Sequence, residues 1–431
     1  MMIQLYLKQG WALIRQNKFY TLMYVMGTAL AITMVMVMAI VHYINTANIA
    51  PETQRSRMLI VARAVAKVEG TNYSSGASLS HQTLEACYYN LERAEGVAAV
   101  TVDGIEQLFG SFNISTPGSR ELFTAKLKAS NAYFFRLFRY AFIAGKPYTE
   151  TDFRSEIKTA VLSESLARKL FQSTELDGRS ILINNVEFAV SGIVRDVSDM
   201  LPYTSGDIWV PYTSLPEIRD FNIENVCGLL KAFILAKSPG DFDAIRDEII
   251  QKSKVYNLSL PEYKYVIGDH DILSHFQTVY ADSLNNLGVR FLKYGLIALL
   301  FLLVPAINLS GLIASRMQDR LAELGIRKAF GANRHSLLSQ VLTENFLLTL
   351  MGGAVGLAAS ALVVSHFQKE LFGGFHSYGA QMDLDITFSM LFNLPVFLYS
   401  LALCVLLNIL SSVIPVISST RKAIVSSLFD K

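Results

Sequence analysis

The sequence has 431 residues, of which 52% are hydrophobic and only 17% are charged. Soluble domains carry about 25% charged residues, so this composition excludes a disordered chain and indicates that part of the surface is not in water. Residues 45–290 contain 25 Lys or Arg and 29 Asp or Glu, whereas the rest of the chain contains 13 and 7. Basic ends around an acidic middle argue against nucleic-acid binding and are typical of a membrane protein whose two sides differ in charge.

Four segments are long and apolar enough to cross a bilayer. The first, residues 20–44, contains no Asp, Glu, Lys or Arg and exceeds the roughly 20 residues that a spanning helix needs. The others have their apolar cores at 294–314, 346–364 and 396–414. We therefore expect an α-helical membrane protein with four transmembrane helices, over residues 19–44, 291–315, 338–365 and 388–417.

The first apolar segment is much longer than the roughly 7–15-residue core of a signal peptide, so we interpret it as an uncleaved anchor. Lys8, Arg15 and Lys18 precede it without an acidic residue, and the link 316–337 and the tail 418–431 are also basic. Positive loops stay in the cytoplasm. The sequence thus predicts a multi-pass protein of the cytoplasmic (inner) membrane with both termini inside. The outside segments are residues 45–290 and a short loop, 366–387.

The opening residues 1–18 have apolar side chains at helical spacing. We expect an amphipathic helix on the cytoplasmic membrane surface, with Lys8 and Arg15 on the polar side. The apolar face consists of Ile3, Leu7, Trp11 and Ile14.

Residues 45–290 are long enough to bury a core of their own, and their pattern is mixed α/β. Strands are predicted over 159–162, 180–183 and 187–193. Helices are predicted over 163–171 with Ser163 as N-cap, over 80–93, and over 241–253 with Asp241 as cap. We expect a large extracytoplasmic domain, inserted between helices 1 and 2, with two subdomains between which the chain passes more than once.

The sequence has no catalytic motif. No phosphate-binding loop, H-E-x-x-H or G-x-S-x-G occurs, so we predict that the chain is not an enzyme and has no metal site. Asp269, His270, Asp271 and His275 come closest to a metal cluster, but their spacing favours a polar turn. Cys87 and Cys227 are both predicted outside, where a buried free thiol is favoured over a disulfide.

Small and polar residues within the predicted spans indicate helix packing. Gly352, Gly356 and Ser360 form a small-xxx-small stripe that permits close contact between helices. Isolated asparagines, Asn308 and Asn408, more often join helices than line a transport pathway. No series of charged residues crosses the membrane, which argues against an ion channel or a secondary transporter.

The cytoplasmic link after the second span has the order R-x-x-E-x-G-I-R-K-A-x-G-A, followed by L-x-x-x-x-L-x-E and a glycine-rich span. It resembles the MacB/FtsX family of ABC-transporter permeases. The outside stretches KASNAYFFRLFRYAFIAGKPYTETDF, TAVLSESLARKLF and LDGRSILINNVEFAVSGIVRDV resemble the MacB-like periplasmic core domain. The tail departs from the family pattern, because Val425 or Ser426 stands in place of a second proline. The motif residues in the link are Arg320, Glu323, Gly325, Ile326, Arg327, Lys328, Ala329, Gly331 and Ala332, with Glu344 after them.

The resemblance implies a machine without a through-pore. A separate ABC ATPase, which binds ATP and Mg, would contact the link, and this chain would hold no cofactor. Two permease copies, as a homodimer or a paralogous heterodimer, would sit among membrane lipids, and an extracytoplasmic adaptor or hydrolase could join them. The contact residues would be Arg320, Glu323, Gly325, Arg327, Lys328, Gly331 and Ala332.

Two classes of function follow from the resemblance. In the first, the permease converts ATP hydrolysis into motion of its outside domain (mechanotransmission) and thereby exports or releases a peptide, lipid, lipoprotein or drug. In the second, an FtsX-like signalling subunit regulates an outside partner such as a cell-wall hydrolase. The large outside domain favours the first class, the efflux and lipoprotein-release side of the family.

Overall fold

The computed structural model describes residues 18–71, 73–176, 178–201, 203–268, 270–279 and 334–367, with short pieces at 296, 311, 371, 394–395, 397–403, 405–406 and 409. Contacts divide the chain into two units. One contains Met1–Tyr43, Asn286–Leu371 and Ile386–Lys431, and the other contains Ile44–Asn285 and Phe372–Asp385.

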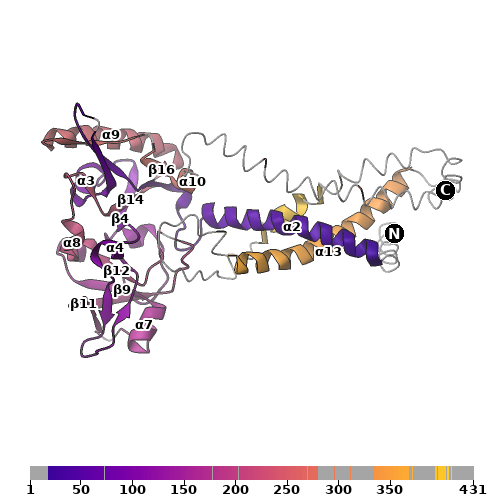
Figure 1. Ribbon diagram of the computed structural model, residues 1–431, viewed down its shortest axis with the longest axis horizontal. Helices are drawn as coiled ribbons and strands as arrows, with labels where there is room; N and C mark the ends of the chain where they lie inside the picture. The colour runs from indigo at the N-terminus through magenta and orange to yellow at the C-terminus, as the bar shows by residue number, and fades with distance from the viewer. Residues whose placement is uncertain are drawn as a thin grey trace. The chain divides into compact units, whose positions relative to one another are not determined.

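Two apolar helices form the described part of the first unit. They are α2 (Lys18–Thr46) and α13 (Arg334–His366), which lie side by side (Figure 1). Both are long and apolar enough to cross a membrane. They cover the first and third of the predicted spans. The spans predicted over 291–315 and 388–417 fall largely outside the described residues.

The second unit is the α/β domain, which confirms the mixed α/β class. Its early strands are β1 (Met58–Val61), β2 (Ala64–Val68), β3 (Ser74–Leu79) and β4 (Ala94–Thr101). Its middle strands are β5 (Asn113–Ser115), β6 (Phe123–Thr124), β7 (Leu127–Ser130), β8 (Phe142–Gly145), β9 (Thr159–Ser163), β10 (Ser180–Ile183), β11 (Val186–Val194) and β12 (Ile208–Pro211). Its late strands are β13 (Cys227–Gly228), β14 (Leu230–Ala236), β15 (Tyr263–Val266) and β16 (Ile272–Ser274).

Helices connect these strands, and all of them except α9 are short. Those near the early and late strands are η1 (Arg55–Arg57), α3 (His81–Cys87), α4 (Glu106–Phe109), η3 (Pro239–Asp241), α9 (Phe242–Ser259) and α10 (His275–Val279). Those near the middle strands are α5 (Phe134–Leu137), α6 (Glu150–Arg154), α7 (Glu164–Phe171), η2 (Tyr212–Ser214) and α8 (Pro216–Arg219).

The strands form one sheet in the order β15-β2-β3-β14-β4-β7-β12-β9-β11-β10-β5-β6, with β1 on β14, β16 on β1, β13 on β3 and β8 on β11. Two pairs, β7 with β12 and β9 with β11, are parallel. We call the strands from β15 to β4, with β1, β13 and β16, the first half-sheet, and the strands from β7 to β6, with β8, the second. The chain forms β1 to β4 in the first half-sheet and β5 to β12 in the second, and then returns to the first to form β13 to β16.

Several predicted elements agree with the structure. Strands β9, β10 and β11 occupy the predicted segments, and the Ser163 hydroxyl caps α7 by accepting from the Leu166 amide. The helix predicted over 80–93 is wrong in length, because α3 ends at Cys87 and Asn90 adopts a left-handed φ of 61°. Helix α9 extends to Ser259, and Asp241 occupies its N-cap position without a side-chain cap bond.

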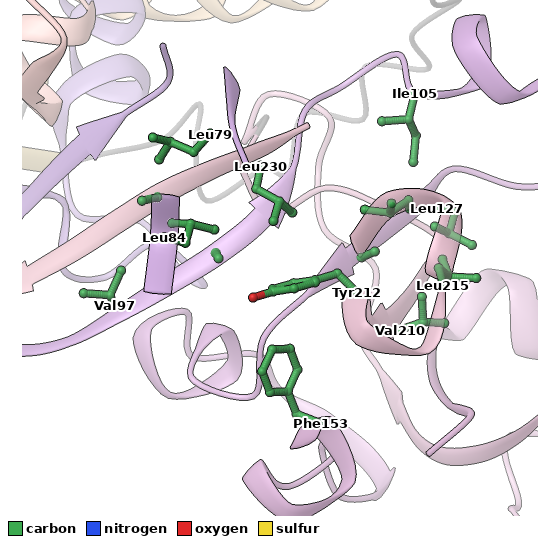
Figure 2. Close-up of a cluster of buried hydrophobic side chains, with 14 of the residues drawn as sticks. Leu79, Leu84, Val97, Ile105, Leu127, Phe153, Val210, Tyr212, Leu215 and Leu230 are labelled. Atoms are coloured by element: carbon green, nitrogen blue, oxygen red, sulfur yellow. The ribbon is translucent and has the colours of Figure 1, made fainter. Parts of the chain in front are cut away.

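The two faces of the sheet bury different cores. Along β14, Leu230 and Ile234 belong to one cluster and Phe233 to the other, as the two-residue period of a strand requires. The first cluster runs through both half-sheets, and Figure 2 shows the Phe153 ring beneath Tyr212, with centroids 4.9 Å apart in an edge-to-face contact. The second cluster is aromatic and includes Trp209, Phe134, Phe138 and Phe233.

The half-sheets meet through one paired position, Val100 on β4 with Ser130 on β7. Asn131 extends this join: its amide N–H donates to Ala99 O over 3.0 Å, its Oδ1 accepts from Ala99 N over 3.1 Å, and its Nδ2 donates to Val97 O over 2.8 Å. The buried side chain therefore takes the place of a further strand residue. Polar groups of the β4 backbone that face the join are satisfied in this way.

We expect Asn131→Ala to destabilise the α/β domain by about 2–6 kcal/mol, because it leaves two buried backbone groups without partners at about 1–3 kcal/mol each. Thermal unfolding of the full chain, followed by tryptophan fluorescence, measures the effect. Gln251→Ala, at an exposed position of α9, is the control and should unfold like the wild type. Equal unfolding temperatures for both variants would contradict a structural role for this amide.

Candidate functional site

The residues predicted to contact an ATPase lie outside the described part of the chain. These are Arg320, Glu323, Gly325, Arg327, Lys328, Gly331 and Ala332. Asn308 and Asn408 are outside it as well. Gly352, Gly356 and Ser360 are described and lie on α13. The site that the structure does describe is therefore α2, its contact with α13, and the place where α2 ends.

Two glycines of α13 lie directly against α2. A Cβ at Gly352 would be 2.2 Å from Thr28 Oγ1, and a Cβ at Gly356 would be 2.8 Å from Ala29 O. No side chain fits at either distance, so glycine is what lets the two backbones approach. Thr33 Oγ1 lies 2.7 Å from Ala29 O and 3.2 Å from Gly356 O, and so can donate to its own helix or to α13. Contacts of this kind hold helices together where hydrophobic burial cannot.

Ser360 continues the same face of α13. Its side chain is fully buried, and its hydroxyl donates to Leu357 O in its own helix over 2.8 Å. Because the Ser360 side chain is small and its hydroxyl bonds within α13, this position permits a close approach by a neighbouring helix.

The last turn of α2 is capped by an arginine from the segment that follows it. Arg55 Nη1 donates to Ile44 O over 2.7 Å and to Ala47 O over 2.9 Å. Its Nε donates to Glu52 Oε2 over 2.8 Å, and both charged side chains are almost fully buried. The last carbonyl groups of a helix have no partner in the helix and carry partial negative charge, so a cation is favourable there. We call Glu52 and Arg55 the buried pair.

A second cap comes from the other end of the domain. His275, at the start of α10, donates from Nε2 to Asn45 O over 2.8 Å, and its ring meets the Tyr203 ring at a centroid distance of 5.9 Å. Burial, together with the positive charge of Arg55, lowers the pKa of His275 to about 4. The imidazole is therefore neutral near pH 7, and two segments more than 200 residues apart in the sequence hold one helix end.

The sequence does not single out the buried pair. An acid and a base three residues apart directly after an apolar span are a weak indication of local pairing, but nothing in the pattern indicates their burial. The sequence pattern favours a polar turn for His275 together with Asp271, whereas in the structure His275 begins α10 and bonds to Asn45 O at the end of α2. Cys87 and Cys227 are buried free thiols, and burial raises the pKa of Cys87 to about 12.

Residues 21–252 match the MacB-like periplasmic core domain, and residues 295–424 match the FtsX-like permease C-terminal domain. The chain belongs to the MacB/FtsX family of ABC-transporter permeases. The first match starts within α2 and ends within α9, so it covers most of the helix and strands β1 to β14.

Curated relatives agree with this family. The chain is 22% identical over 263 residues to the uncharacterized ABC transporter permease YknZ of Bacillus subtilis, which covers 59% of this chain and 62% of that protein. It is 27% identical to the pyoverdine export ATP-binding/permease protein PvdT of Pseudomonas entomophila, over 54% of this chain and 34% of that one. It is also 27% identical to the macrolide export ATP-binding/permease protein MacB of Burkholderia cenocepacia, over 51% and 30%. The matched region thus spans between about a third and three fifths of these relatives.

Two solved structures are similar at low identity. The periplasmic region of MacB from Actinobacillus actinomycetemcomitans has 15% identity and a TM-score of 0.36, covering 54% of this chain and 94% of that one. The extracellular domain of the noncanonic ABC-type transporter YknZ from Gram-positive bacteria has 14% identity and a TM-score of 0.33, covering 48% and 100%.

We expect Gly356→Val to destabilise this permease in the membrane, because the new side chain would meet Ala29 O and Ile32. Overpacking of this kind costs about 1–3 kcal/mol. The measurement is the thermal stability of the detergent-solubilised chain. Ala354→Val, on an exposed part of the same helix, is the matched control and should behave like the wild type. Equal losses in both variants would argue against a close contact at Gly356.

His275 should make the stability depend on pH. An unfolded histidine has a pKa of about 6.5, above the value of about 4 in the fold, so its contribution is complete above pH ~6.5 and is lost as the pH falls toward 4. The slope is at most about 1.4 kcal/mol per pH unit. The unfolding temperature of the wild type should therefore drop more between pH 7 and pH 5 than that of His275→Asn. Identical drops would show that His275 does not titrate in this way.

Proposed function

We propose that this chain is a permease subunit that converts ATP hydrolysis on a partner ATPase into motion of its α/β domain, and so exports or releases a peptide, lipid, lipoprotein or drug. The observation that carries the proposal is the continuity of α2. It runs as one unbroken helix from Lys18 to Thr46, and Arg55 of the buried pair and His275 donate to carbonyls of its last turn. A stiff helix fixed to a folded domain can transmit displacement, which a flexible linker cannot.

The relatives favour export over signalling. PvdT and MacB are named for the export of pyoverdine and of macrolides, and both names join an ATP-binding part to a permease. We infer that the present chain supplies the permease part and that a second copy completes the assembly. Because α2 and α13 are in close contact, we expect the two helices to move together when a force acts at their cytoplasmic ends.

The cytoplasmic link is the proposed site of ATPase contact. It carries Arg320, Glu323, Gly325, Arg327, Lys328, Gly331 and Ala332 in the family's order. Glu323 and Arg327 are four residues apart. On a helix, an ion pair at this spacing contributes only about 0.2–0.5 kcal/mol to stability when both side chains are in water. At a subunit interface, loss of one partner costs about 2–5 kcal/mol, because the other remains buried and unpaired.

Glu323→Ala and Arg327→Ala should leave the chain in the membrane at normal levels but reduce the amount of co-purified ATPase at least tenfold. Asp319→Ala, a charged residue of the same link outside the family motif, is the matched control and should retain the ATPase. Pull-down from solubilised membranes, with ATP hydrolysis measured on the eluate, decides the matter. Wild-type recovery with all three variants would overturn the proposed contact, and hydrolysis by this chain alone would overturn the division of labour.

A further inference from the structure

Glu52 of the buried pair has a second hydrogen-bond partner, Thr204. Thr204 lies in the turn between β11 and β12, is fully buried, and donates from Oγ1 to Glu52 Oε1 over 2.9 Å. Leu201 O is also within 3.3 Å of this hydroxyl. The carboxylate is the closer acceptor and is charged, which makes it the stronger one. Glu52 is therefore held by Arg55 on one oxygen and by Thr204 on the other.

Tyr140 carries the same chain of contacts into the second half-sheet. Its hydroxyl donates to the Thr204 carbonyl over 2.5 Å. Its ring packs edge-on against Trp209 of β12, with centroids 5.2 Å apart. The neighbouring Arg139 N–H donates to Pro51 O over 3.0 Å, so the backbone before β8 also touches the segment that follows α2. Tyr140 and Trp209 both belong to the aromatic core on one face of the sheet.

These contacts form a relay from the end of α2 to β12. In order, the relay consists of the carbonyls of Ile44 and Ala47, then Arg55, Glu52, Thr204, Tyr140 and Trp209. All of its side chains are buried. Directional hydrogen bonds and a close-packed core resist small displacements, so a shift of the last turn of α2 must move the Thr204 turn or break a buried charge contact.

We propose that Thr204 is a positioning residue that makes the second half-sheet follow α2. The contacts of the relay are a property of the fold, whereas their role in transmitting motion rests on the proposed function. The first half-sheet has its own attachments to α2, through η1 leading into β1 and through His275. Without the Thr204 hydroxyl, the second half-sheet would lose its direct contact with the buried pair and would follow through the Arg139 bond to Pro51 O, the ring contact of Tyr203 with His275, the join at Asn131 and the shared core.

The relay predicts that a change at Thr204 loosens the end of α2, more than 150 residues away in the sequence. Thr204→Val keeps the shape and removes the hydroxyl, so Glu52 loses one donor and holds Arg55 less firmly. The carbonyls of the last turn then lose part of their cap. We expect the amides of residues 43–47 to exchange with deuterium at least threefold faster in the full chain, reconstituted in lipid nanodiscs, than in the wild type.

Matched variants separate the relay from general loss of packing. Thr213→Val removes a buried hydroxyl that also donates to a carbonyl, Phe153 O, and should leave residues 43–47 unchanged. Tyr140→Phe should increase their exchange, whereas Tyr148→Phe should not. Both tyrosines are buried in the same cluster and pack at 5.3 Å on Phe135, but Tyr148 bonds to Ser130 and Val210 O instead. Thr204→Ser, which keeps the hydroxyl, should restore the wild-type rate.

Wild-type exchange in both Thr204→Val and Tyr140→Phe would overturn the relay, as would equal increases in the two control variants. If Thr204→Val does not fold, Tyr140→Phe and Thr204→Ser still decide the question. A second arm adds the co-purified ATPase with a non-hydrolysable ATP analogue. In the wild type the analogue should change exchange at residues 203–207, and in Thr204→Val it should not. A wild type without any nucleotide response would overturn the proposed function, while the nucleotide-free comparison would still test the relay.

Discussion

The last turn of α2 ends in carbonyl groups that no helical N–H can reach, and this constraint organises the structure around it. In an exposed helix, water would satisfy them. Here Ile44 is fully buried, so donors must come from the protein. Arg55 donates to Ile44 O and also to Ala47 O directly after the helix, and His275 donates to Asn45 O. These donors come from segments that precede β1 and follow β16. The hydrogen bonds that satisfy this helix end therefore also fix the segments next to β1, the first strand of the sheet, and β16, the last.

A buried ion pair is not favourable merely because it is paired. Moving two charges out of water costs several kcal/mol each, and removing one partner leaves the other uncompensated at about 3–5 kcal/mol. The buried pair offsets this cost by using nearly every polar atom. Arg55 bonds to a carboxylate and two carbonyls, and Glu52 bonds to Arg55 and Thr204. Such an arrangement tolerates one geometry far better than any other, because a displacement of either side chain leaves a buried charge without a partner.

Local patterns predicted much of the fold. The alternation in EFAVSGI gives β11, and Ser163 before an amphipathic run gives a capped α7, because both depend on neighbours in the sequence. The buried pair and the Thr204 contact could not be predicted. Glu52 and Thr204 are 152 residues apart, and only the strand order brings them together. Helix α3 is shorter than predicted because the apolar pattern of 80–93 continues beyond Cys87 while the backbone turns at Asn90. The small-residue pattern of the span predicted that Gly352 packs against another helix. It could not predict that the contacting residue is Thr28, which is far away in the sequence.

The same reasoning explains why the two half-sheets should respond together. A sheet joined by one paired position would bend there if nothing else held it. Asn131 extends the pairing on the β4 side, and the first core cluster continues from Leu84 to Phe153 across the join (Figure 2). Both half-sheets are also fixed to one helix end, the first by His275 and the second by Thr204 through Glu52. A bend at the join would therefore have to break one of these attachments as well as the pairing at Val100 and Ser130.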